Sequence, residues 1–114
     1  MDIIITHEHA DLDALASLVA ANCLYEDAVC IRNAQVSTLT QRYLALHKDS
    51  LPIERPEVVD LDELGTVIAV DSRKRSRLSE FSEFLEAADR VVVYDHHPAS
   101  EDDIEADEAY VEPV

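Results

Sequence analysis

Imidazole and carboxylate side chains recur in this sequence at the points where short apolar segments end. In chain order they are His7, Asp11, Asp13, Asp71, Asp95, His96 and His97. Such side chains are the ligands that borderline and hard divalent ions, among them Mn²⁺, Co²⁺, Zn²⁺ and Mg²⁺, prefer in proteins. At least three carboxylates and two imidazoles exceed the needs of one tetrahedral ion. They fit a two-ion site with a shared carboxylate and ions about 3.5–4 Å apart.

Each of these side chains also has an ordinary structural explanation. Asp11, Asp13 or Asp71, taken alone, could cap a helix. The pair His96-His97 could belong to a surface turn before Pro98. Their joint placement after three separate apolar segments is what favours a metal site.

Short strands alternating with helices must position these residues. Apolar runs predict strands over 2–6, 28–31, 66–70 and 90–94. Helical spacing predicts helices over 12–25, 37–48 and 77–88. Prolines predict a loop over 51–56, and segment 58–61 indicates a minor strand or a turn. The alternation predicts an α/β fold, a single domain with a mostly parallel sheet and helices on both faces. Parallel strands share one carboxyl edge, so the candidate ligands are expected to converge on one crevice there.

Composition limits the function classes. The chain has 114 residues and a formal net charge of −16, which argues against a protein that coats nucleic acid. Its one glycine, Gly65, excludes a glycine-rich phosphate loop. No run of 18 apolar residues is present, so we expect no membrane span. We interpret Cys23 and Cys30 as reduced core thiols, as in a cytoplasmic protein without a secretory signal.

A basic run follows Asp71. Residues 72–77 hold four of the nine basic residues, and at the carboxyl edge they could face phosphate oxygens. Arg73 is the nearest to the predicted site and is our candidate for phosphate binding. The alternative is a solvated start of the next helix.

The chain divides into a domain over residues 1–98 and an acidic segment over 99–114. That segment is expected to be either solvated or the start of an incomplete element, because its last residues become apolar again. An orphan apolar segment beside a sheet edge invites pairing with a second copy. We therefore also expect self-association, most simply as a homodimer.

In order, the candidate ligands resemble the motifs of the DHH phosphoesterase superfamily. The stretch His7-x-x-x-Asp11-x-Asp13 matches the first motif, Asp71 at a strand end the second, and Asp95-His96-His97 the third. The sequence of the first motif is most similar to that of the N-terminal DHH domain of certain large bacterial proteins. In those proteins, CBS domains and a poly(A)-polymerase-like or tRNA-nucleotidyltransferase-like domain follow.

The resemblance implies a role for each residue. His7 and Asp11 would hold one ion, Asp13 and His96 the other, Asp71 would bridge them, His97 would face the substrate phosphate, and Asp95 would orient a histidine. The implied cofactor is Mn²⁺ in a two-ion site, with Mg²⁺, Co²⁺ or Zn²⁺ as alternatives. The implied reaction is hydrolysis of a phosphodiester or phosphoanhydride in a phosphate-containing small molecule, a nucleotide or a short oligonucleotide.

The family's fourth motif and its C-terminal substrate-clamping domain do not appear in this chain. We therefore expect turnover at least about a hundredfold below that of a longer parent protein, the scale on which lost positioning acts. Two alternatives stay open: a catalytically silent metal-binding or interaction module, and a flavodoxin-like acidic regulatory domain that binds one Mg²⁺. The second alternative leaves His7 and His96 without a role.

Overall fold

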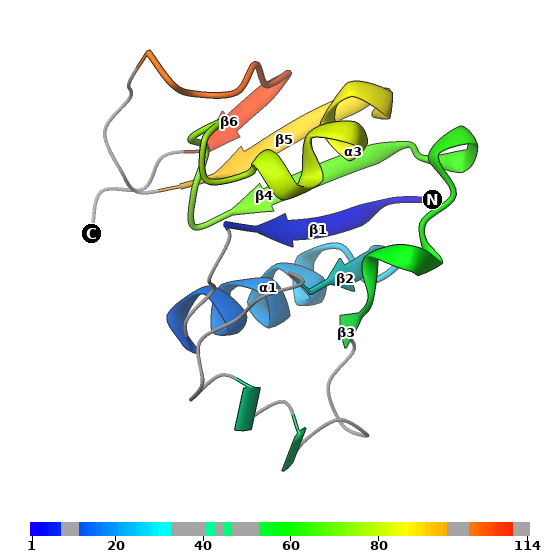
Figure 1. Ribbon diagram of the computed structural model, residues 1–114, viewed down its shortest axis with the longest axis vertical. Helices are drawn as coiled ribbons and strands as arrows, with labels where there is room; N and C mark the ends of the chain where they lie inside the picture. Colours follow the sequence, from blue (N-terminus) through cyan, green and yellow to red (C-terminus); the bar gives the residue numbers. More distant parts are fainter. Residues whose placement is uncertain (8–11, 33–40, 43–44, 47–52, 96–100, 111–114) are drawn as a thin grey trace.

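Six parallel strands form one sheet in the part of the chain that the structure describes (Figure 1). The structure is a computed structural model that describes residues 1–7, 12–32, 41–42, 45–46, 53–95 and 101–110, with the backbone alone for 12–15, 19 and 23. The strands are β1 (Ile3–Thr6), β2 (Val29–Ile31), β3 (Ile53–Glu54), β4 (Thr66–Val70), β5 (Arg90–Tyr94) and β6 (Glu108–Tyr110). Their spatial order is β3-β2-β1-β4-β5-β6.

The two central strands are β1 and β4. They pair in parallel from Ile3 opposite Val67 to Thr6 opposite Val70. All four residues of β1 are fully buried, as are Val67, Ile68 and Ala69 of β4. Near-continuous apolar runs of this kind are typical of parallel strands that are covered on both faces.

Two helices cover opposite faces of the sheet. Helix α1 (Leu12–Leu24) places Leu18 and Ala21 against one face, in a cluster with Ile4, Ile68 and Val92. On the other face, the 3₁₀ turn η3 (Ser79–Phe81) and helix α3 (Ser82–Ala87) bring Phe81 and Phe84 onto Ile3, Ile5, Val67, Ala69 and Val93. Because successive side chains of a strand point to opposite faces, the alternate residues of β1 and β4 supply both cores.

Gly65 lies at the amino edge of the sheet, where two chain segments approach each other closely. The 3₁₀ turns η1 (Pro56–Val58) and η2 (Leu61–Glu63) lead to it. Its amide donates to the Met1 carbonyl at 2.6 Å, and the next amide, that of Thr66, donates to Asp2 Oδ1 at 2.9 Å. A Cβ atom on Gly65 would lie 2.8 Å from that carboxylate oxygen. A Cβ atom at this position would therefore displace the Asp2 carboxylate from the Thr66 amide.

The predicted strands over 2–6, 28–31, 66–70 and 90–94 are confirmed with bounds that differ by at most one residue. The helix predicted over 12–25 is also confirmed, and the one predicted over 77–88 begins later, as a 3₁₀ turn. Of the helix predicted over 37–48, residues 41–42 and 45–46 are helical, and the rest lies outside the described residues.

The loop prediction over 51–56 was wrong in part. The segment 51–56 contains β3, which pairs with β2 at the edge of the sheet, where a short strand beside prolines is tolerated. For segment 58–61, predicted as a minor strand or a turn, the structure shows the turn: residue 58 ends η1 and residue 61 begins η2. The acidic segment is not a solvated tail throughout, because its residues 108–110 form β6 and pair with β5.

Candidate functional site

The strand order creates a switch point between β1 and β4. From β1 the chain moves outward to β2 and β3, and from β4 it moves outward in the opposite direction to β5 and β6. In open parallel sheets, ligands bind beyond the carboxyl ends of the strands at such a point. His7 directly follows β1, and Asp71 directly follows β4. The sheet therefore places these two side chains at the position where a ligand is expected.

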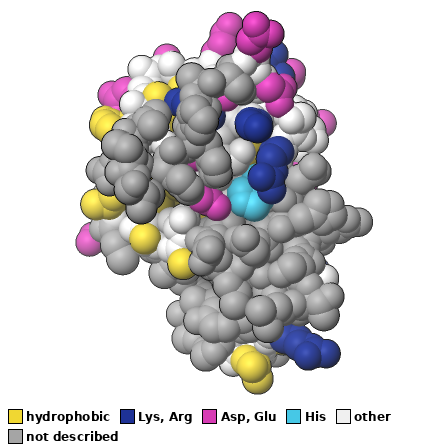
Figure 2. Space-filling model, turned by 90° about the vertical axis from the view of Figure 1, so that its left-hand side faces the viewer, with side chains coloured by type: hydrophobic (Ala, Val, Ile, Leu, Met, Phe, Trp, Pro, Cys, Tyr) yellow, Lys and Arg dark blue, Asp and Glu magenta, His cyan; other side chains and the backbone are white. Residues whose placement is uncertain are grey.

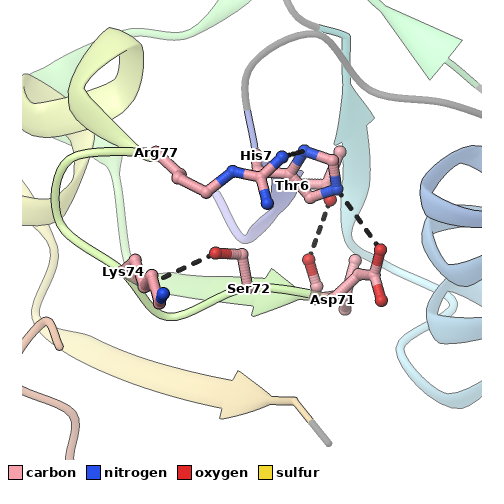
Figure 3. A network of polar contacts seen from close by, with 7 residues as sticks. Thr6, His7, Asp71, Ser72, Lys74 and Arg77 are labelled. Atoms are coloured by element: carbon pink, nitrogen blue, oxygen red, sulfur yellow. Dashed lines mark hydrogen bonds and ion pairs between the residues drawn. The ribbon is translucent and has the colours of Figure 1, made fainter. Parts of the chain in front are cut away.

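His7 and Asp71 contact each other across this switch point. The Nε2 atom of His7 lies 3.3 Å from Oδ2 of Asp71 (Figure 3). The hydroxyl of Thr6 donates to the Val70 carbonyl at 2.8 Å and thereby ties the two strand ends together. His7 is 5% exposed, whereas the Asp71 side chain is 17% exposed and reaches solvent. The pair thus presents a carboxylate to solvent above a buried imidazole.

Asp71 has the one left-handed backbone conformation among the described non-glycine residues, with φ 62°. Its amide still donates to the Tyr94 carbonyl at 2.9 Å, so the β4–β5 ladder continues through the strand end. Aspartate and asparagine tolerate this region better than other non-glycine residues, and such outliers cluster at functional sites. Asp71 therefore leaves β4 in a left-handed conformation while its amide stays bonded to β5.

The other ring nitrogen of His7 contacts Arg77. Nη2 of Arg77 lies 3.1 Å from Nδ1 of His7, and the arginine side chain extends toward the imidazole (Figure 3). A guanidinium can only donate, so Nδ1 is the acceptor in this contact. The ring is then the neutral tautomer whose Nε2 proton is donated to Asp71. Looking onto this edge, Figure 2 shows the histidine between acidic and basic side chains.

Arg73 does not extend to His7 but lies between two carboxylates. Its Nε atom is 3.7 Å from Oδ2 of Asp95 and 3.2 Å from Oδ2 of Asp103. Arg73 is 9% exposed and Asp95 is 5% exposed. Arg73 therefore joins the turn after β4 to the residue after β5 and to the acidic segment.

The turn that follows β4 is fastened by that same acidic segment. The Arg75 amide donates to the Asp102 carbonyl at 2.6 Å, and the Ile104 amide donates to the Arg73 carbonyl at 2.8 Å. The Ser76 hydroxyl donates to Oδ2 of Asp102 at 2.5 Å. The hydrogen bonds from Ser76, followed by the nearby basic side chains, lower the pKa of the Asp102 carboxyl below its ordinary value.

Two further groups, the partly buried Tyr94 and the buried Cys30, have raised pKa values. Desolvation, followed by the hydrogen bond with Tyr25, raises the pKa of Tyr94 to about 12. The two hydroxyls lie 2.5 Å apart, and the Tyr94 ring stacks on Tyr110 with centroids 4.8 Å apart. Burial alone raises the pKa of the Cys30 thiol to about 11, so this thiol stays protonated at neutral pH.

The structure describes the side chains of only some of the predicted site residues. His7 and Asp71 lie together, and Asp95 lies beside Arg73. Asp11, His96 and His97 lie outside the described residues, and for Asp13 the structure describes only the backbone, in the first turn of α1. Among the described residues, no group of three or more His, Cys, Asp or Glu side chains could hold an ion. The predicted ligand roles therefore stay predictions.

Sequence reasoning missed Arg77 and Asp103. Arg77 belongs to the basic run that was singled out, but closeness to Asp71 along the chain favoured Arg73 instead. The turn over residues 74–78 reverses the chain, with the amides of Arg77 and Leu78 both donating to the Lys74 carbonyl at 3.1 Å. Proximity in sequence was therefore the wrong criterion for contact with His7.

Comparisons with known proteins agree with the motifs. The chain matches the family described as the DHH family, N-terminal domain, over residues 3–114. It is 36% identical over 106 residues to an A-adding tRNA nucleotidyltransferase of Geobacter sulfurreducens, a match that covers 91% of this chain and 12% of that protein. No described helix has the length and apolar character needed to cross a membrane. Family and relative together show that this chain belongs to the DHH family, as its N-terminal domain, and is related to a tRNA nucleotidyltransferase.

Proposed function

We propose that this chain is a divalent-metal-dependent phosphoesterase domain that acts on a phosphodiester or a phosphoanhydride, with Mn²⁺ as the preferred ion. The observation that carries the proposal is the contact between His7 and Asp71 at the switch point of the sheet. Family membership supports the same reaction class.

The spacing of the two donor atoms is compatible with a shared ion. Two ligands bound at about 2.1 Å to a tetrahedral ion lie roughly 3.4 Å apart. Nε2 of His7 and Oδ2 of Asp71 are 3.3 Å apart. One imidazole and one carboxylate form a donor pair suited to borderline divalent ions. In the proposal Asp11, Asp13 and His96 would join His7 and Asp71 in holding the two ions, with Asp71 as the carboxylate that both would share.

When bound, the ions would supply Lewis-acid chemistry, activating a water nucleophile and offsetting negative charge on the phosphate. The chain's own residues would prepare the geometry. The Thr6 hydroxyl holds the ends of β1 and β4 together, so His7 and Asp71 keep their spacing. Burial of the His7 ring limits its competing contacts with water. In the proposal His97 faces the substrate phosphate, and Asp95 orients a neighbouring histidine.

The proposed substrate class is supported by the relative. The relative's name concerns tRNA, which makes a nucleotide or a short oligonucleotide the proposed source of the phosphate. This chain corresponds to 12% of that relative. The proposed role is therefore that of one domain in a larger nucleotidyltransferase-like protein.

The test compares metal binding and hydrolysis in matched variants. Calorimetry with Mn²⁺ alone and hydrolysis of a dinucleotide would be measured for the wild type, Asp71→Asn and Asp62→Asn. Asp62 is an exposed residue of η2, so its variant carries the same change in charge away from the site. We expect Asp71→Asn to lose at least about a hundredfold in Mn²⁺ affinity and to abolish hydrolysis, because altering even an outer partner of a ligand costs about 10–100-fold.

Two other results are informative. Mn²⁺ binding that depends on Asp71 without any hydrolysis would support the catalytically silent metal-binding module. Equal Mn²⁺ affinity in the wild type and Asp71→Asn would contradict the proposed site.

A further inference from the structure

The basic turn after β4, residues 72–78, holds four cationic side chains with different surroundings. Arg73 is buried between Asp95 and Asp103, so its charge is already compensated within the protein. Lys74 and Arg75 are exposed. Arg77 is also exposed, yet its guanidinium contacts His7 beside Asp71. Of these four cations, Arg77 is therefore the one that the described contacts place in the candidate site.

The backbone on both sides of Arg77 is anchored. Ser76 is bound to Asp102 through its hydroxyl at 2.5 Å and its amide at 3.3 Å. Leu78, on the other side, is 1% exposed and belongs to the core beneath α3. An anchored backbone directs the arginine side chain to the carboxyl edge at a low cost in conformational entropy. Such preorganisation is characteristic of groups that bind ligands.

The present partner of Arg77 is a weak one for a guanidinium. The neutral imidazole of His7 offers a single acceptor nitrogen, whereas a phosphate offers charged oxygens that a guanidinium can bind in a bidentate manner. Hydrogen bonds to charged acceptors are roughly twice as strong as neutral ones. An exposed guanidinium at this position would therefore exchange the imidazole for a phosphate oxygen.

We infer that Arg77 is a phosphate-binding residue of this site, whose guanidinium exchanges its contact with His7 for a substrate phosphate oxygen. The inference rests on the proposed function for its ion site, and it assigns to Arg77 the role for which sequence reasoning selected Arg73. It also gives a strongly acidic chain a cation at the point where an anionic substrate must bind.

The test uses Arg77→Ala beside Arg75→Ala, a variant of an exposed arginine in the same turn with the same change in charge. Calorimetry would measure Mn²⁺ alone and then inorganic phosphate on the Mn²⁺-loaded protein. We expect Arg77→Ala to bind phosphate about tenfold more weakly, the size of one lost charge-assisted contact. The same variant should bind Mn²⁺ more tightly, since a nearby positive charge is removed. Arg75→Ala should change neither by more than about twofold, as exposed charges contribute little.

If Arg77 had a merely structural role, Arg77→Ala would not weaken phosphate binding and strengthen Mn²⁺ binding at the same time. Arg77→Lys should recover part of the phosphate affinity, because lysine keeps the charge but not the bidentate geometry. Equal phosphate affinity in Arg77→Ala and Arg75→Ala would overturn the inference, and so would an absence of phosphate binding in the wild type.

A measurement without metal separates this inference from the proposed function. In the metal-free protein, inorganic phosphate should shift the imidazole ¹⁵N signal of His7 in the wild type and in Arg75→Ala, but not in Arg77→Ala. A wild-type chain that shows this shift but neither binds Mn²⁺ nor hydrolyses a dinucleotide would refute the metal-dependent function and leave the phosphate contact standing. Hydrolysis that persists in Arg77→Ala with unchanged phosphate affinity would refute the phosphate contact and leave the metal-dependent function standing.

Discussion

Replacing Asp71 by alanine or by glycine tests the backbone conformation of the residue at the centre of the site. With φ 62°, a residue with a Cβ is in the left-handed region, which costs alanine about 1–2 kcal/mol. Glycine avoids that cost but loses about 0.4–1 kcal/mol through the greater entropy of its unfolded chain. Both variants lose the same contact with His7, so this loss cancels in their comparison. We expect Asp71→Gly to be more stable than Asp71→Ala by about 0.5–1 kcal/mol.

This order of stability is the reverse of the ordinary one. Within a helix or strand, a glycine variant is usually less stable than the alanine variant by about 0.5–1 kcal/mol. Urea unfolding should show a midpoint about 0.5 M higher for Asp71→Gly, for a slope of about 1–3 kcal/mol per M. The pair Glu86→Ala and Glu86→Gly, at an exposed position of α3, supplies the control and should show the ordinary order. An alanine variant at position 71 that equals or exceeds the glycine variant would refute the reasoning.

Three further changes have expected outcomes. Gly65→Ala would place a Cβ 2.8 Å from Asp2 Oδ1 and displace that carboxylate from the Thr66 amide. The lost hydrogen bond should cost about 1 kcal/mol, seen as a fall of several degrees in the thermal midpoint, and an unchanged midpoint would contradict this reasoning. Arg73→Ala removes the cation that the buried Asp95 and Asp103 face, and it should cost about 2–4 kcal/mol in urea unfolding, whereas Lys74→Ala should cost far less. The pKa of Tyr94 is raised from 10.0 to about 12, so the folded state favours the neutral phenol. Its contribution to the free energy of unfolding is fully present below pH 10 and should be lost as the pH rises from about 10 to about 12. Tyr94→Phe should lack this part of the pH dependence, and an identical fall in that variant would show that another group causes it.

Much of the local structure could be predicted because each strand carries its own signal. The three isoleucines of β1 and the runs of β4 and β5 are continuous apolar segments, as strands buried on both faces must be. The prediction failed where the signal was nonlocal. Strand β3 has two residues beside prolines, and β6 lies in an acidic segment; both exist because a neighbouring strand offers its backbone groups. Such pairing depends on residues distant in sequence, which local propensity does not register.

The sequence by itself determined which residues end the strands and the family to which the chain belongs, since motif spacing and apolar periodicity are local properties. Only the tertiary structure decided the order of the strands. Placing β1 beside β4, rather than beside β2 alone, is what brings His7 to Asp71 across 64 residues. The structure also decided between two arginines four positions apart. Arg73 turns inward to Asp95 and Asp103, while Arg77 contacts His7, because the fastened turn over 72–78 reverses the chain between them.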